Sequence, residues 1–153
     1  MNYMSHNRGI SLLEVMISIA IIGLLLAIVF GSFSTIRNRQ ILEVNRDLIV
    51  SVLTKAKSDT FASKGSKSYG VYVDTGANRL ITFEGTTYIP NEVTNQLSTL
   101  DNRVSISAVD GGSTIVFERL TGFVSTLHSI NIMLQNEEEK VINIFPTGVI
   151  LSE

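Results

Sequence analysis

The 153-residue sequence contains no cysteine, which excludes disulfide bonds, thiolate catalysis and thiolate metal sites together. It has only two histidines, His6 and His128, and they form no set with the spacing of metal ligands. No nucleophile elbow or phosphate-binding loop occurs either. We therefore interpret His128 as an edge or partly buried residue, and we expect neither an enzyme nor a bound metal or cofactor.

Charge is absent from one long stretch, because no charged residue occurs between Glu14 and Arg37. At about 1.5 Å per helical residue this run is long enough to cross a hydrocarbon core of about 30 Å. The sequence thus predicts a membrane helix whose span covers about 12–33. A carboxylate inside such a segment costs roughly 2.5–3.5 kcal/mol on insertion scales, so Glu14 is expected to be a functional residue that another group neutralises.

Two simpler readings of this stretch remain open. Ser11 and Glu14 have the spacing of a helix capping box, in which the glutamate satisfies backbone donors at the positive end of the helix dipole. Capping is compatible with a further role for Glu14. Alternatively the stretch is a secretory signal peptide cleaved near 29–31, although its apolar region would exceed the usual length and would contain a glutamate.

Proline is also scarce, and neither of the two prolines lies within 10–64. Past the uncharged run, apolar residues recur at helical spacing. They are Ile36, Ile41, Val44, Leu48, Val52 and Ala56, with Ile49 and Leu53 widening the stripe. We expect one helix over 10–64, apolar on all sides in its first half and amphipathic in its second, with a hinge at Gly31 and Ser32 as the alternative.

From residue 65 onward the hydrophobic period changes to two. Short runs rich in β-branched and aromatic residues are separated by turn sequences. The runs cover 69–73, 80–83, 103–107, 114–117, 129–134 and 140–145. We expect an α+β fold in which a small antiparallel β-sheet or β-sandwich, 65–153, packs one face against the long helix, with a loop over 91–101.

The start of the chain resembles the type IV pilins and pseudopilins. Gly9, Ile10 and Glu14 match their class III signal, in which a short basic leader ends in glycine and a glutamate follows at the fifth position of the apolar helix. The resemblance implies a leader peptide over 1–9, cleavage between Gly9 and Ile10 by a prepilin peptidase, and N-methylation of Ile10. It also implies a filament in which Glu14 pairs with the N-terminal ammonium of a neighbouring subunit. Gly31 stands where many members carry a proline.

A second resemblance concerns the β-rich part. The segment from Phe117 through the turn at Gly122, followed by an alternating strand and Gly148, is similar to the β-domain of H-type pseudopilins of type II secretion and of FimT-like minor pilins. The alternative interpretation of the same residues is a phenylalanine in the hydrophobic core and two turns. The C-terminal segment 148–153 carries no lysine or arginine, so no nucleic-acid partner is expected.

The resemblance implies a single-pass protein of the inner (cytoplasmic) membrane, with its β-domain outside the cytoplasm and within a periplasmic or extracellular filament after assembly. The implied partners are other pilin or pseudopilin subunits, the prepilin peptidase, an inner-membrane assembly platform and the lipid bilayer. A count of basic residues alone would predict the opposite orientation. One arginine, Arg8, precedes the span, and three follow it, Arg37, Arg39 and Arg46. The alternative function is a membrane-anchored β-domain for ligand binding or adhesion, with Glu14 acting only as a cap.

Overall fold

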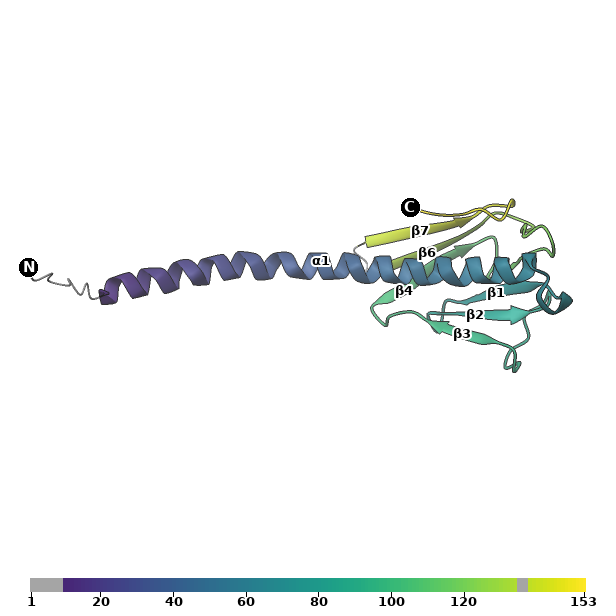
Figure 1. Cartoon of the computed structure of the whole chain (residues 1–153), viewed down its shortest axis with the longest axis horizontal. Coiled ribbons are helices and arrows are strands. Elements are labelled where there is room, and N and C mark those ends of the chain that lie inside the picture. The colour runs from purple at the N-terminus through teal and green to yellow at the C-terminus, as the bar shows by residue number, and fades with distance from the viewer. Residues whose placement is uncertain (1–9, 135–137) are drawn as a thin grey trace, which may run out of the picture. The chain divides into compact units, whose positions relative to one another are not determined.

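The computed structural model describes residues 10–134 and 138–153, and the side chains at 29–36 and at 138 lie outside this description. The expected leader, 1–9, lies outside it as well. The chain divides into two compact units, Met1–Arg37 and Asn38–Glu153. Helix α1, Leu12–Phe61, begins in the first unit and ends in the second (Figure 1).

Eight strands in the second unit form two antiparallel sheets. One sheet has the order β3-β2-β1-β5 and the other has the order β4-β6-β7-β8. The first sheet contains β1 (Tyr69–Asp74), β2 (Arg79–Glu84), β3 (Gln96–Thr99) and β5 (Thr114–Val116). The second contains β4 (Val104–Asp110), β6 (His128–Leu134), β7 (Glu138–Ile144) and β8 (Ile150–Ser152). The expected α+β fold with an antiparallel β-domain is confirmed.

The helix ends in a left-handed turn. Ser63 has φ 49°, and a short 3₁₀ turn, η1 (Lys64–Ser66), follows with Gly65 at φ 60°. Thr60 fixes this end to the first strand, because its hydroxyl accepts a hydrogen bond from the Tyr69 backbone N–H at 2.8 Å and donates one to the Tyr69 carbonyl at 3.3 Å. Both backbone groups at the start of β1 are thereby satisfied by a single buried side chain.

The second half of α1 packs one face against the inner faces of both sheets, and Figure 1 shows the two sheets beside it. The buried helical residues are Leu42, Asn45, Ile49, Val52, Leu53, Ala56 and Thr60. The expected apolar stripe is out of phase at its start, since Val44 is 61% exposed while Leu42 is 1% exposed. Two polar residues, Asn45 and Thr60, also occupy the buried face. Hydropathy alone therefore misplaced the start of the stripe, whereas its members Ile49, Val52, Leu53 and Ala56 are buried as predicted.

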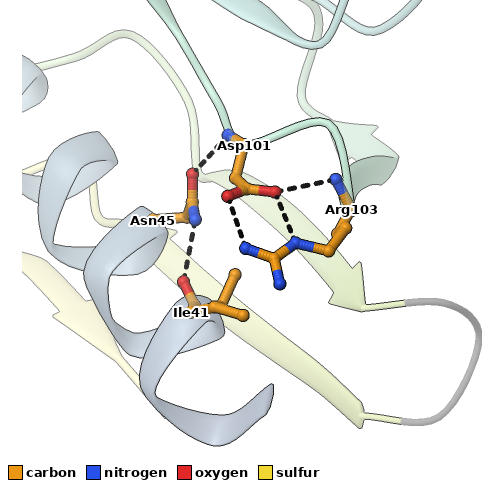
Figure 2. A network of polar contacts seen from close by, with 4 residues as sticks. All are labelled: Ile41, Asn45, Asp101 and Arg103. Atoms are coloured by element: carbon orange, nitrogen blue, oxygen red, sulfur yellow. Dashed lines mark hydrogen bonds and ion pairs between the residues drawn. The ribbon is translucent and has the colours of Figure 1, made fainter. Parts of the chain in front are cut away.

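Asn45 connects the helix to the loop before β4, as Figure 2 shows. Its Nδ2 donates to the Ile41 carbonyl at 2.8 Å, and its Oδ1 accepts from the Asp101 backbone N–H at 2.8 Å. The Asp101 carboxylate in turn accepts from Arg103 Nε at 3.0 Å and Nη2 at 2.9 Å. This guanidinium lowers the pKa of Asp101 to about 2. The network fixes the entry to the second sheet relative to the helix.

We predict that Asn45→Ala destabilises the β-domain by about 1–3 kcal/mol, because the partly buried Asp101 N–H loses its acceptor. Tyrosine fluorescence during urea unfolding of the full-length protein in detergent measures the change. Ser51→Ala is the matched control on the same helix, since Ser51 is exposed and its hydroxyl donates only to the Leu48 carbonyl. The control should change stability by no more than about 0.5 kcal/mol. Equal stability of the two variants would contradict a structural role for Asn45.

Candidate processing and assembly site

The residues expected at the processing site lie at the start of α1. Gly9 lies outside the described residues, whereas Ile10 precedes the helix and is 75% exposed. Ser11 caps the helix, because its hydroxyl oxygen accepts a hydrogen bond from the Glu14 backbone N–H at 3.2 Å. The residue after the expected cleavage bond, Ile10, is therefore accessible and precedes a capped helix end.

Glu14 lies in the first turn of α1 and is exposed. Its backbone takes part in the cap, and its carbonyl accepts from the Ser18 hydroxyl at 2.8 Å. Within the described part of the chain, no donor or cation pairs with its carboxylate. Only half of the capping box is formed, which leaves the charge available for a group from another molecule.

The described side chains between Glu14 and Arg37 form an apolar surface without a cover. The large apolar residues of this segment, from Val15 to Ile28, are each at least 45% exposed. So extensive an apolar surface marks a site of contact with a protein or a membrane. Over the described residues, no helix combines the length and hydropathy needed to cross a bilayer. The expected span of 12–33 includes 29–33, whose side chains lie outside the description.

His128 is buried at the start of β6. Its ring nitrogens lie 3.3 Å from the Gly112 carbonyl oxygen and 3.3 Å from the Thr126 hydroxyl, so both have partners within the domain. Burial lowers the pKa of His128 and favours the neutral ring. Among the described residues no group of three or more histidine, aspartate or glutamate side chains is arranged to hold a metal ion.

Two turns that are far apart in the sequence lie next to each other and beside one lysine of α1, Lys57. Gly122 and Gly148 have φ values of 67° and 72°, and the Lys57 ammonium donates to the Gly148 carbonyl at 2.8 Å. A Cβ at Gly148 would collide with the Gly122 carbonyl oxygen, and one at Gly122 would press on the Lys57 stem. The turns require glycine both for backbone conformation and for this close approach.

The family model for the prokaryotic N-terminal methylation motif matches residues 4–30, which include Gly9, Ile10 and Glu14. No curated protein is similar enough in sequence to count as a match. Among solved structures, the type IV minor pilin FimU of Pseudomonas aeruginosa is 13% identical, with a TM-score of 0.56 over 75% of this chain and 89% of that one. The minor pseudopilin EpsH from the type 2 secretion system of Vibrio cholerae is 14% identical, with a TM-score of 0.50 over 74% of this chain and 93% of that one.

The N-terminal motif and the fold together are similar to those of type IV pilins and pseudopilins. At 13–14% identity the two solved structures establish the pilin fold alone. The motif adds a prepilin-type N-terminus, of the kind that suggests membrane anchoring. The suspected resemblance is therefore confirmed by two separate observations, the N-terminal motif and the fold.

Sequence reasoning missed the residues that attach helix α1 to the β-domain, Asn45, Thr60 and Lys57. A polar residue within an otherwise apolar helical stripe is the signal that could have identified the first two, because such a residue is buried only with hydrogen-bond partners. The role of Lys57 had no such signal, since its acceptor is 91 positions away along the chain.

We predict that the β-domain loses stability as the pH falls through the ordinary pKa of histidine, about 6.5. The pKa of His128 is lower in the folded state, so the unfolded state binds more protons and stability decreases on acidification. One proton limits the slope to about 1.4 kcal/mol per pH unit. Urea unfolding between neutral and mildly acidic pH measures it.

His128→Gln should flatten this dependence, because glutamine does not titrate. The loss caused by protonation of Asp101 belongs to a separate, more acidic window, between 3.8 and about 2. A slope in the mildly acidic range that persists in His128→Gln would contradict the assignment to His128.

Proposed function

We propose that the chain is a structural subunit, a minor pilin or pseudopilin, of a type IV pilus or a type II secretion filament. The observation that carries the proposal is the Glu14 carboxylate, which pairs with no donor or cation among the described residues. It lies at the start of an exposed apolar helix, within a prepilin methylation motif. A charge in such surroundings is tolerated only when a partner from outside the chain neutralises it.

The proposed mechanism is assembly through the first half of α1. This segment resides in the bilayer as a single pass over about 12–33 and then moves into a bundle of equivalent helices. Cleavage between Gly9 and Ile10 produces a new ammonium at Ile10, and N-methylation retains its positive charge. The Glu14 carboxylate of one subunit pairs with this ammonium on its neighbour. Both the apolar surface and the carboxylate are then covered.

The remaining elements of the proposal follow from this pathway. A prepilin peptidase removes 1–9, and an inner-membrane assembly platform transfers the subunit from the lipid to the filament. The β-domain, 65–153, lies outside the cytoplasm throughout. The subunit acts by assembly and not as an enzyme.

Processing provides the first test. Mass spectrometry of protein isolated from its native membrane should find an N-terminal peptide that begins with N-methylated Ile10. Gly9→Leu should leave the leader in place, because a bulky side chain at this position blocks the cleavage that the motif specifies. An intact Met1 in the native protein would instead support a membrane-anchored β-domain with an uncleaved start.

Charge pairing provides the second test. Glu14→Gln should reduce filament incorporation at least about tenfold, because burial of the neighbour's ammonium without a counter-charge costs about 3–5 kcal/mol. Immunoblots of sheared filament fractions, normalised to processed protein in the membrane, measure the effect.

Ser11→Ala is the matched control, because it removes the observed cap and leaves the Glu14 charge in place. It should be incorporated nearly as well as wild type. Equal losses in the two variants would show that Glu14 acts through helix capping and would overturn the pairing mechanism.

A further inference from the structure

Strand β3 forms one edge of the first sheet, and β2 is its only partner strand within the described part of the chain. Figure 1 shows it as the outermost strand on its side of the β-domain. Its sequence, Gln-Leu-Ser-Thr, contains neither a charged residue nor a proline, which are common means of blocking a free edge. Leu97, in the middle of this strand, is 59% exposed.

The register of β3 determines which backbone groups face outward. The Leu100 N–H donates to the Asn78 carbonyl at 3.1 Å, and bonded positions alternate from there along the antiparallel pair. Leu97 and Thr99 lie between the bonded positions, so their N–H and C=O groups point away from β2. Among the described residues these groups have no hydrogen-bond partner. The free edge therefore offers both donors and acceptors to an extended backbone.

The outer face of the sheet beside β3 has an apolar pocket floor. Leu97 and Ile81, which are paired across the two strands, line a pocket of about 260 Å³ together with Tyr88. Its charged lining residues, Arg79 and Glu92, have opposite signs and give no preference for a charged group. An apolar side chain is the group that this face would take.

The other face of β3 lies beside a cation of α1. The Lys55 ammonium donates to the Gln96 side-chain oxygen at 3.0 Å, and within the described residues it forms no ion pair. The acidic residues that line the same groove of α1, Asp47 and Asp59, are paired with other cations. The charge of Lys55 thus lacks an acidic partner within the described part of the β-domain and its helix.

We propose that the free edge of β3 binds an extended segment of another protein by strand addition, and that this segment alternates acidic and apolar residues. Successive side chains of a strand point to opposite faces, so every second residue can reach Lys55 while the others contact Leu97 and its pocket. The backbone of the segment bonds to the outward groups of Leu97 and Thr99. The proposal concerns the second unit alone and does not depend on filament assembly.

Hydrogen exchange tests the proposal. Isotope-labelled, full-length protein in detergent is mixed with a short blocked peptide in which glutamate and valine alternate, and exchange is followed for each amide by NMR. We expect exchange at Leu97 and Thr99 to slow at least about threefold, because their N–H groups become bonded. The N–H of Ser152 also points away from its partner strand, so it is the internal control and should be unaffected. A peptide with lysine in place of glutamate should have no effect.

Two substitutions separate charge from backbone pairing. Lys55→Gln should raise the dissociation constant of the glutamate peptide about threefold, as expected for one exposed ion pair. Lys140→Gln is its matched control, because Lys140 lies on β7 of the second sheet, and it should bind like wild type. Thr99→Pro should raise the constant about fivefold by removing one outward N–H while the bonds to β2 remain. Thr99→Ala should not change it.

Each part of the proposal can fail separately. Unchanged exchange at Leu97 and Thr99 in wild-type protein, with the peptide at millimolar concentration, overturns strand addition at this edge. Equal slowing by the glutamate and lysine peptides, or equal binding by Lys55→Gln and wild type, overturns the acidic character of the partner. Equal binding by Thr99→Pro and Thr99→Ala overturns backbone pairing.

Discussion

The β-domain depends on one buried face of α1, between Leu42 and Thr60. Each sheet is open, with four strands and one apolar inner face, and neither sheet closes on itself to cover that face. Helix and sheets contribute to a single hydrophobic core. The polar members of the helical face, Asn45 and Thr60, then determine where the chain leaves the helix and enters each sheet, because each is buried with backbone partners from a sheet or its entry loop.

In the first unit the described large apolar side chains are exposed. Those between Glu14 and Ile28 are each at least 45% exposed within this unit. A segment of this kind is stable only when lipid or other helices remove it from water. The N-terminal methylation motif matches the same residues, and the proposed filament would remove this apolar surface from water.

Much of the fold could be predicted from local sequence, because alternation and turn residues mark β1, β2 and β6 clearly. The short strand β3 lies in the expected loop, since its four residues, Gln-Leu-Ser-Thr, are mostly exposed and show no buried alternation. The predicted phase of the helix was wrong at Val44 because the buried face includes the polar residues Asn45 and Thr60. Their hydrogen-bond partners lie in other elements, so the helical sequence alone does not reveal that they are buried. Gly9, Ile10 and Glu14 were recognisable because the motif is local, whereas the meeting of Gly122 and Gly148 over Lys57 depends on the whole fold.

In the proposed pathway, the position of Glu14 makes assembly depend on processing. While the helix is in the bilayer, a carboxylate near the interface can remain hydrated, so it needs no protein partner. In a helical bundle the same carboxylate is buried, and an unpaired charge there is strongly destabilising. Before cleavage the Ile10 nitrogen is a neutral amide, and only hydrolysis after Gly9 converts it into a cation. An uncut neighbour therefore offers Glu14 no ammonium, and the bundle favours processed subunits over unprocessed ones.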